Sequence, residues 1–68
     1  LNAGRVNINT AMVSELDALP GIGPTTAQTI VDFRFQHGPF INIQDVQNVP
    51  GIGPATYDRI KDYITVEP

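Results

Sequence analysis

The spacing of apolar residues along the chain predicts four short helices separated by turns. They are expected over residues 11–18, 25–36, 43–48 and 55–63. Within each stretch apolar side chains recur every three or four residues, which is the spacing of one buried helix face. Residues 5–9 alternate briefly and predict an extended lead-in, whereas residues 64–68 are expected to form a terminal tail. No convincing sheet is expected.

Capping residues set the predicted helix ends. Thr10 is expected to cap the first helix and Asn42 the third, because side-chain oxygens of these types accept hydrogen bonds from the first turn. Gly38 and Pro39 should end the second helix, since glycine suits the left-handed cap and proline cannot continue a helix. The residues expected on buried faces are Met12, Leu16, Leu19, Ala27, Ile30, Val31, Val46, Val49, Tyr57, Ile60 and Ile64.

A six-residue segment is written twice in this short chain. Leu-Pro-Gly-Ile-Gly-Pro at 19–24 returns thirty residues later as Val-Pro-Gly-Ile-Gly-Pro at 49–54. The same offset pairs Leu16 with Val46 and Ile30 with Ile60, so the repeat includes the flanking helices. We therefore predict one all-α domain over 1–68, in which two helix-hairpin-helix units pack about a pseudo-two-fold axis. The first unit is placed at about 10–37, the linker at 38–42 and the second unit at about 43–64.

Each hairpin delivers glycines directly to the start of a helix. Glycine lets the backbone approach a partner closely, and the first N–H groups of a helix have no partner inside it. Together they predict a pocket for phosphate oxygens. The central Ile22 and Ile52 are expected to turn inward and pack the hairpins. The predicted backbone donors are those of Gly21, Gly23, Thr25, Thr26, Gly51, Gly53, Ala55 and Thr56.

Glycine in a helical hairpin more often serves only to turn the chain, and it is the duplication that favours binding. The dinucleotide fingerprint and the Gly-Lys-Ser/Thr phosphate loop are both absent from the sequence. Scattered carboxylates and a lone His37 offer no catalytic arrangement, so we predict no enzyme activity, no metal site, no cofactor and no small-molecule substrate. His37 is expected to stabilise the last carbonyls of its helix.

Charge argues against tight binding of nucleic acid. The net charge is −3 at pH 7, and the chain has only four lysines and arginines. Arg59 and Lys61 lie on the fourth helix, where they either contact a backbone passing the second hairpin or form a solvated face. Arg34 falls within an apolar stripe and is expected to serve the fold. So few cations predict weak binding with a shallow salt dependence.

Motifs along nearly the whole chain, from about Arg5 to Val66, resemble the tandem helix-hairpin-helix domain of the bacterial competence protein ComEA family. Taken in order, they are Val6–Ala11, Leu19–Pro24 with Ala27 and Ile30, Gly38–Phe40, Asp45–Val46 and Val49–Gly53. An ordered set of this kind is far more specific than one hairpin. The basic residues that often follow each hairpin in the family are replaced here by Thr25-Thr26 and Ala55-Thr56.

The resemblance implies sequence-independent binding of double-stranded DNA as part of a DNA-uptake receptor. It implies that the two hairpins lie across the minor groove and hold one strand each through backbone amides. It also implies an exported protein, periplasmic or at the cell surface, anchored by a segment upstream of this chain, with self-association on DNA as a further prediction. The alternative is a structural or oligomerisation module that keeps the fold with weak or no DNA binding.

Overall fold

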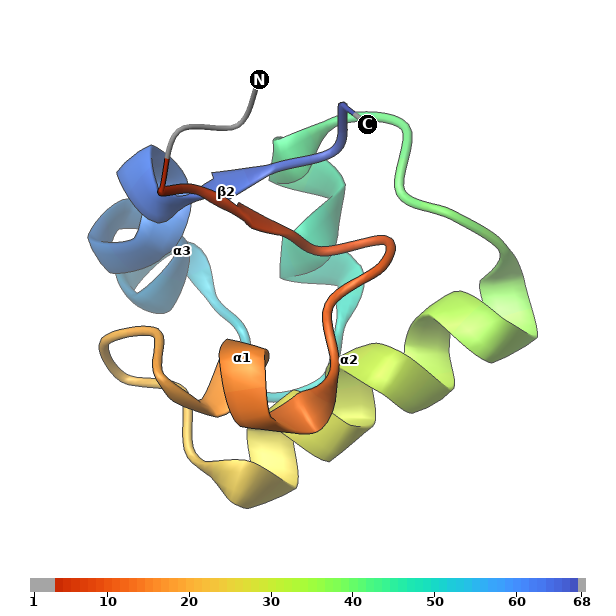
Figure 1. Ribbon diagram of the computed structural model, residues 1–68, viewed down its shortest axis with the longest axis horizontal. Helices are drawn as coiled ribbons and strands as arrows, with labels where there is room; N and C mark the ends of the chain where they lie inside the picture. The colour runs from red at the N-terminus through yellow and green to blue at the C-terminus, as the bar shows by residue number, and fades with distance from the viewer. Residues whose placement is uncertain (1–3, 68) are drawn as a thin grey trace.

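Four helical segments make up half of residues 4–67, the part of the chain that the computed structural model describes (Figure 1). They are α1 (Val13–Asp17), α2 (Pro24–His37), the 3₁₀ helix η1 (Ile43–Asn48) and α3 (Pro54–Ile60), which a short 3₁₀ turn, η2 (Lys61–Tyr63), extends. The predicted all-α class is thereby confirmed. No helix within residues 4–67 is long and apolar enough to cross a membrane.

The first helix begins later than expected. Thr10 and Ala11 donate their N–H groups to the Asn7 carbonyl, at 3.1 and 2.8 Å, so they belong to a turn before the helix. Met12 holds the N-cap position, and the Glu15 carboxylate accepts a hydrogen bond from the Met12 N–H at 3.0 Å. The prediction of Thr10 as the cap was wrong. Met12, expected to be buried, is 71% exposed because it lies outside the helix.

The other helix boundaries follow the sequence closely. Helix α2 exceeds its predicted span by one residue at each end, and Gly38 (φ 86°) ends it by donating to the Arg34 carbonyl at 3.0 Å. Segment η1 begins after Asn42 as predicted, although it winds as a 3₁₀ helix, and Asp45 accepts a hydrogen bond from the Asn42 N–H at 3.2 Å. The predicted fourth helix is α-helical only to Ile60.

A small parallel sheet joins the lead-in to the segment expected to be a tail. Strand β1 (Val6–Asn7) lies beside β2 (Ile64–Thr65) in the register Val6↔Ile64 and Asn7↔Thr65 (Figure 1). The Ile8 N–H extends the ladder by donating to the Thr65 carbonyl at 3.0 Å. The expectation of no sheet was wrong, because strands of two residues leave no alternation to detect. Pro68 lies outside the described residues.

One core joins the two halves of the chain. Residues paired by the thirty-residue offset are buried together, with Leu16 and Val46 both fully buried and Ile30 and Ile60 likewise. Ile8 and Phe40 are core residues that the helical pattern did not predict, because they lie in the lead-in and the linker. The buried hydrophobic set is Ile8, Ala11, Leu16, Leu19, Ile22, Ala27, Ile30, Phe40, Val46, Val49, Ile52, Ile60 and Ile64.

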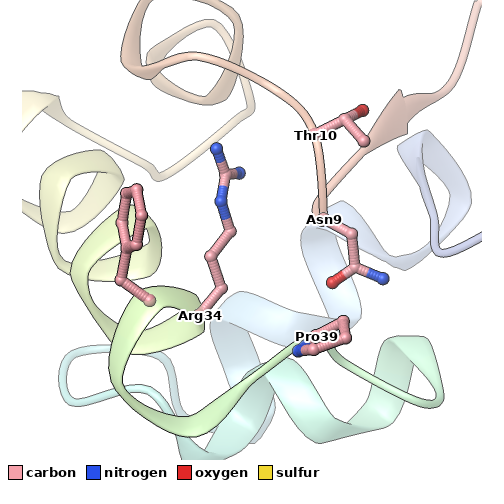
Figure 2. A pocket seen from close by; sticks show the side chains of 5 residues that line it. Asn9, Thr10, Arg34 and Pro39 are labelled. Atoms are coloured by element: carbon pink, nitrogen blue, oxygen red, sulfur yellow. The ribbon is translucent and has the colours of Figure 1, made fainter.

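Polar side chains attach the lead-in to the linker and to α2. The Asn9 side-chain amide donates to the Phe40 carbonyl at 3.0 Å and accepts from the Phe40 N–H at 2.7 Å. The Arg34 side chain extends from α2, and its Nη1 donates to the Ile8 carbonyl at 3.0 Å. Figure 2 shows Asn9, Thr10, Arg34 and Pro39 around the hollow between these segments. Arg34 therefore serves the fold, as expected.

Replacing Arg34 with methionine should destabilise the chain without weakening any ligand contact at the hairpins. The apolar part of the side chain is retained, but the Ile8 carbonyl loses its charged donor. Hydrogen bonds to charged groups contribute about 1.5–3 kcal/mol, and we expect a loss near the lower end of that range at this half-buried site. Urea unfolding followed by circular dichroism measures it. An unchanged unfolding midpoint would contradict this assignment.

Candidate nucleic-acid interface

The two hairpins have the same backbone conformation. In the first, the Ile22 N–H donates to the Leu19 carbonyl at 3.1 Å across Pro20 and Gly21, and Gly21 has φ +81°. In the second, the equivalent bond to the Val49 carbonyl is 3.0 Å. Proline followed by a glycine of positive φ is the signature of a type II turn. Gly21 is thus required by the backbone of its turn.

The middle residue of each hairpin points into the core. Ile22 is 4% exposed and Ile52 is 2% exposed, so each closes its turn against the core. The prediction that these isoleucines pack inward is confirmed. Each turn therefore has its middle side chain in the core, while its first glycine, Gly21 or Gly51, is exposed.

The second glycine of each hairpin has a different role. Gly23 and Gly53 are the N-cap residues of α2 and α3, with φ −95° and −97°, an extended conformation open to any residue. A Cβ built on either glycine meets no atom within 4 Å. Neither the backbone conformation nor the packing of the chain therefore requires glycine at these two positions. Glycine at these positions leaves the start of each helix without a covering side chain.

Helix caps differ between the hairpins and the rest of the chain. The helices that do not follow a hairpin, α1 and η1, each have a carboxylate in the first turn, Glu15 and Asp45, that accepts a backbone N–H. The helices that follow the hairpins, α2 and α3, have no acidic residue in the first turn and no side-chain cap. The positive ends of their dipoles therefore face solvent without a protein anion.

The predicted donors are accordingly open. No acceptor among residues 4–67 takes their N–H groups, and the preceding prolines have none to offer. Unpaired donors of this kind at a helix start bind phosphate oxygens well. That these groups bind DNA stays a prediction. The open backbone N–H groups are those of Gly21, Gly23, Thr25 and Thr26 in the first hairpin and of Gly51, Gly53, Ala55 and Thr56 in the second.

Each hairpin lies against a helix of the other unit. The Arg59 guanidinium, which comes from α3, would lie 3.3 Å from a Cβ added to Gly21. The Thr26 hydroxyl oxygen, from α2, would lie 3.7 Å from a Cβ added to Gly51. In Figure 1 the first hairpin, in orange, lies directly beneath α3. The hairpins are therefore part of one surface to which both units contribute.

The four cations are placed unequally. Lys61 pairs with Asp58 at 2.8 Å, and this carboxylate, by accepting its hydrogen bond and by its charge, raises the pKa of Lys61. Arg34 bonds within the fold, whereas Arg5 and Lys61 line a hollow that contains no hairpin residue. Within the described chain only Arg59 has its charged group at a hairpin, and the structure places it against the first one. Sequence spacing alone suggested the second.

Features elsewhere on the surface are explained by packing. His37 meets Phe33 edge-on with ring centroids 4.2 Å apart, and Phe33 stacks on Phe40 at 5.7 Å. The hollow in Figure 2 lies at the far end of α2 from Gly23, about 16 Å away along the axis at the helical rise of ~1.5 Å per residue. Within residues 4–67 no group of His, Cys, Asp or Glu side chains could hold a metal ion.

The chain is similar in sequence to several known proteins. The profile of the helix-hairpin-helix motif matches residues 1–65. ComE operon protein 1 of Bacillus subtilis is 44% identical over 62 residues, which are 91% of this chain and 30% of that protein. An uncharacterised protein of Haemophilus influenzae is 44% identical over 61 residues, or 88% of this chain and 54% of that protein.

A human relative bears a different kind of name. Endonuclease/exonuclease/phosphatase family domain-containing protein 1 is 43% identical over 63 residues, which are 93% of this chain but only 11% of that protein. The likeness is thus confined to a small part of a long protein, and the catalytic name brings no activity to this chain. The expected resemblance to the competence protein is confirmed, and the chain belongs to the helix-hairpin-helix family.

Proposed function

We propose that the chain binds double-stranded DNA without sequence preference, with each hairpin holding the phosphate backbone of one strand across the minor groove. Family membership and the likeness to ComE operon protein 1 support DNA binding in competence. Contacts from backbone amides to phosphates carry no base information, so every duplex should be bound alike. The chain would then serve as the DNA-binding part of an exported uptake protein, with the competence resemblance as the support for that setting.

The observation that carries the proposal is the contrast between the helix caps. This chain places a carboxylate at the N-terminus of each helix that does not follow a hairpin, and leaves the two helices that do follow one uncapped. Serine, asparagine or aspartate in place of the N-cap glycine would add only a few tenths of a kcal/mol of stability. Each of these residues would also block the amides that we propose for phosphate.

Binding should be weak and should depend on salt only shallowly. Each neutralised phosphate contributes about −0.9 to the slope of log K against log salt on duplex DNA. One cation at the hairpins is far fewer than the six to ten contacts of strong binders, and the net charge of −3 opposes approach. Dissociation constants in the non-specific range, roughly 10⁻⁴–10⁻⁶ M, are expected even at low salt.

Fluorescence anisotropy of this 68-residue chain on labelled duplexes tests the proposal. At ~50 mM salt, duplexes of unrelated sequence should give equal affinities that fall as salt rises. A drug that fills the minor groove of an AT-rich duplex should compete, whereas methylation of bases in the major groove should have no effect. Absence of binding at low salt would contradict DNA binding, and binding unaffected by the drug would contradict the groove assignment.

The acidic balance favours one other function, that of a structural or oligomerisation module. Phe35 is 84% exposed and Ile41 74%, so apolar surface remains open on the described part of the chain. Sedimentation of the free chain separates the two functions. A stable oligomer that fails to bind duplex at ~50 mM salt would support this second function and overturn the first.

A further inference from the structure

The two hairpins are alike in backbone but unlike in charge. Their turns share the same hydrogen bond, positive-φ glycine and uncapped helix. Among residues 4–67, however, only Arg59 has its charged group at a hairpin. Arg34 bonds to Ile8, and Arg5 and Lys61 line a hollow that contains no hairpin residue. A ligand that spans both hairpins would therefore meet one charged and one neutral surface.

The charged surface belongs to the first hairpin, although its cation comes from the second unit. Nη1 and Cζ of Arg59 would lie 3.3 and 3.5 Å from a Cβ on Gly21, so the guanidinium rests on the glycine backbone. Arg59 itself is exposed, and its donors have no acceptor within the described chain. A guanidinium offers five N–H donors in a planar fork that fits two phosphate oxygens.

The equivalent position in the first unit cannot act in the same way. The thirty-residue offset relates Arg59 to Thr29, whose hydroxyl donates to the Thr25 carbonyl at 2.9 Å. A Cβ on Gly51 would meet only the neutral Thr26 within 4 Å. Thus the cationic side chain of the second unit has only a neutral counterpart in the first.

We infer that Arg59 binds phosphate at the first hairpin and not at the second. The chain then holds the two strands of a duplex with unequal strength. The inference rests on the proposed function, since it concerns the same surface. The first hairpin combines backbone amides with a guanidinium and is the stronger phosphate site. The second binds through amides and threonine hydroxyls alone, and its contacts form and break more readily.

Neutralising Arg59 should remove one phosphate contact from the salt dependence. In Arg59→Gln the slope of log K against log salt should become shallower by about 0.9, and affinity at ~50 mM salt should fall about tenfold. Lys61→Gln is the matched control. It removes the same charge two residues further along the chain. The Lys61 ammonium is already paired with Asp58, so the slope and the affinity should stay near the parent values.

A double-mutant cycle identifies the hairpin that Arg59 serves. Gly23→Asp disables the first hairpin and Gly53→Asp the second, because each new carboxylate would occupy the helix start. The effect of Arg59→Gln should nearly vanish in the Gly23→Asp background and should persist, about tenfold, in the Gly53→Asp background. Residues that share one ligand contact are non-additive, whereas independent sites add. Gly23→Ser and Gly53→Ser serve as replacements if an aspartate variant fails to fold.

Transplanting the charge gives the converse test. A long side chain at position 29 leans over the preceding turn of α2, toward Thr26 and Gly51. In Arg59→Gln the further change Thr29→Arg should restore the parent slope. The restored affinity should now be lost with Gly53→Asp and kept with Gly23→Asp.

The outcomes separate this inference from the proposed function. If the parent chain does not bind duplex at ~50 mM salt, both are overturned. If the parent binds but Arg59→Gln leaves slope and affinity unchanged, DNA binding stands and the unequal hairpins are overturned. The unequal hairpins are likewise overturned if Arg59→Gln is additive with Gly23→Asp and non-additive with Gly53→Asp.

Discussion

Duplex binding should be lost when Gly23 and Gly53 are both replaced by aspartate, while the fold is kept or slightly stabilised. Both glycines hold extended N-cap conformations with open space where a side chain would project. Aspartate is a favoured N-cap residue, and its carboxylate would accept the N–H groups that we propose for phosphate. It also places a negative charge where the phosphate should lie.

The expected loss is at least tenfold per hairpin, equivalent to about 1.4 kcal/mol each. Anisotropy at ~50 mM salt measures binding, and urea unfolding measures stability. Gln44 lies beside the hollow of Arg5 and Lys61 and away from both hairpins. Gln44→Glu adds the same single charge as each aspartate substitution and should bind nearly as the parent does. Full binding by the double aspartate variant would refute the amide surface.

Substitution at Gly21 or Gly51 is a poorer test of the same surface. Their φ angles of +81° and +95° lie in the left-handed region, where a side chain strains the backbone. A side chain on Gly21 would also displace Arg59. Loss of binding in such variants would mix damage to the turn with loss of the contact, whereas the N-cap glycines separate the two effects.

Ile30→Ala should strongly destabilise the fold. Ile30 is fully buried in α2, and truncating such a side chain costs about 2–5 kcal/mol through lost burial and the cavity left behind. A domain of this length has roughly 3–10 kcal/mol of stability in total, at about 0.05–0.15 kcal/mol per residue. The loss therefore removes a major part of the free energy of unfolding.

Phe35→Ala is the matched control for that prediction. Phe35 lies on the same helix and is larger, but it is 84% exposed. Surface substitutions usually change stability by less than about 0.5 kcal/mol, so its unfolding midpoint should stay near that of the parent. Urea titrations followed by circular dichroism compare the two variants. Equal losses would contradict the assignment of Ile30 to the core and Phe35 to the surface.

The helices and the duplicated hairpin could be predicted because their signals are local. The end of α2 at Gly38 follows from one glycine and one proline, and the inward packing of Ile22 and Ile52 follows from their place between two glycines in a repeated turn. The prediction of Thr10 as the N-cap was wrong although its residue type suits a cap. The turn formed on the Asn7 carbonyl comes before the helix, which therefore starts at Val13. Hydrogen bonds outside the helix decided between two acceptable local structures.

The rest depends on contacts between distant segments. The pairing of Val6 with Ile64 joins segments that are far apart in the sequence. Each strand has only two residues, so neither shows a pattern of its own. The approach of Arg59 to Gly21 needs the packing of one unit on the other, which no spacing within a unit encodes. The open amides could be predicted because they belong to local turns. The hairpin that has the cation could not, because that contact joins the two units.

The parallel pairing of β1 with β2 decides how the domain responds to a pull on its two ends. Tension drawing the chain backward from Val6 and forward from Thr65 slides the strands past each other along their length. The ladder bonds, including that from the Ile8 N–H to the Thr65 carbonyl at 3.0 Å, then bear the load together in shear. The bond from the Asn7 side-chain amide to the Glu67 carbonyl at 2.9 Å adds to them. In an antiparallel pair pulled at the two chain ends that lie side by side, the hydrogen bonds would instead break one after another. Tension of this direction would therefore have to break several hydrogen bonds at once before β1 and β2, the two shortest elements of the fold, could separate.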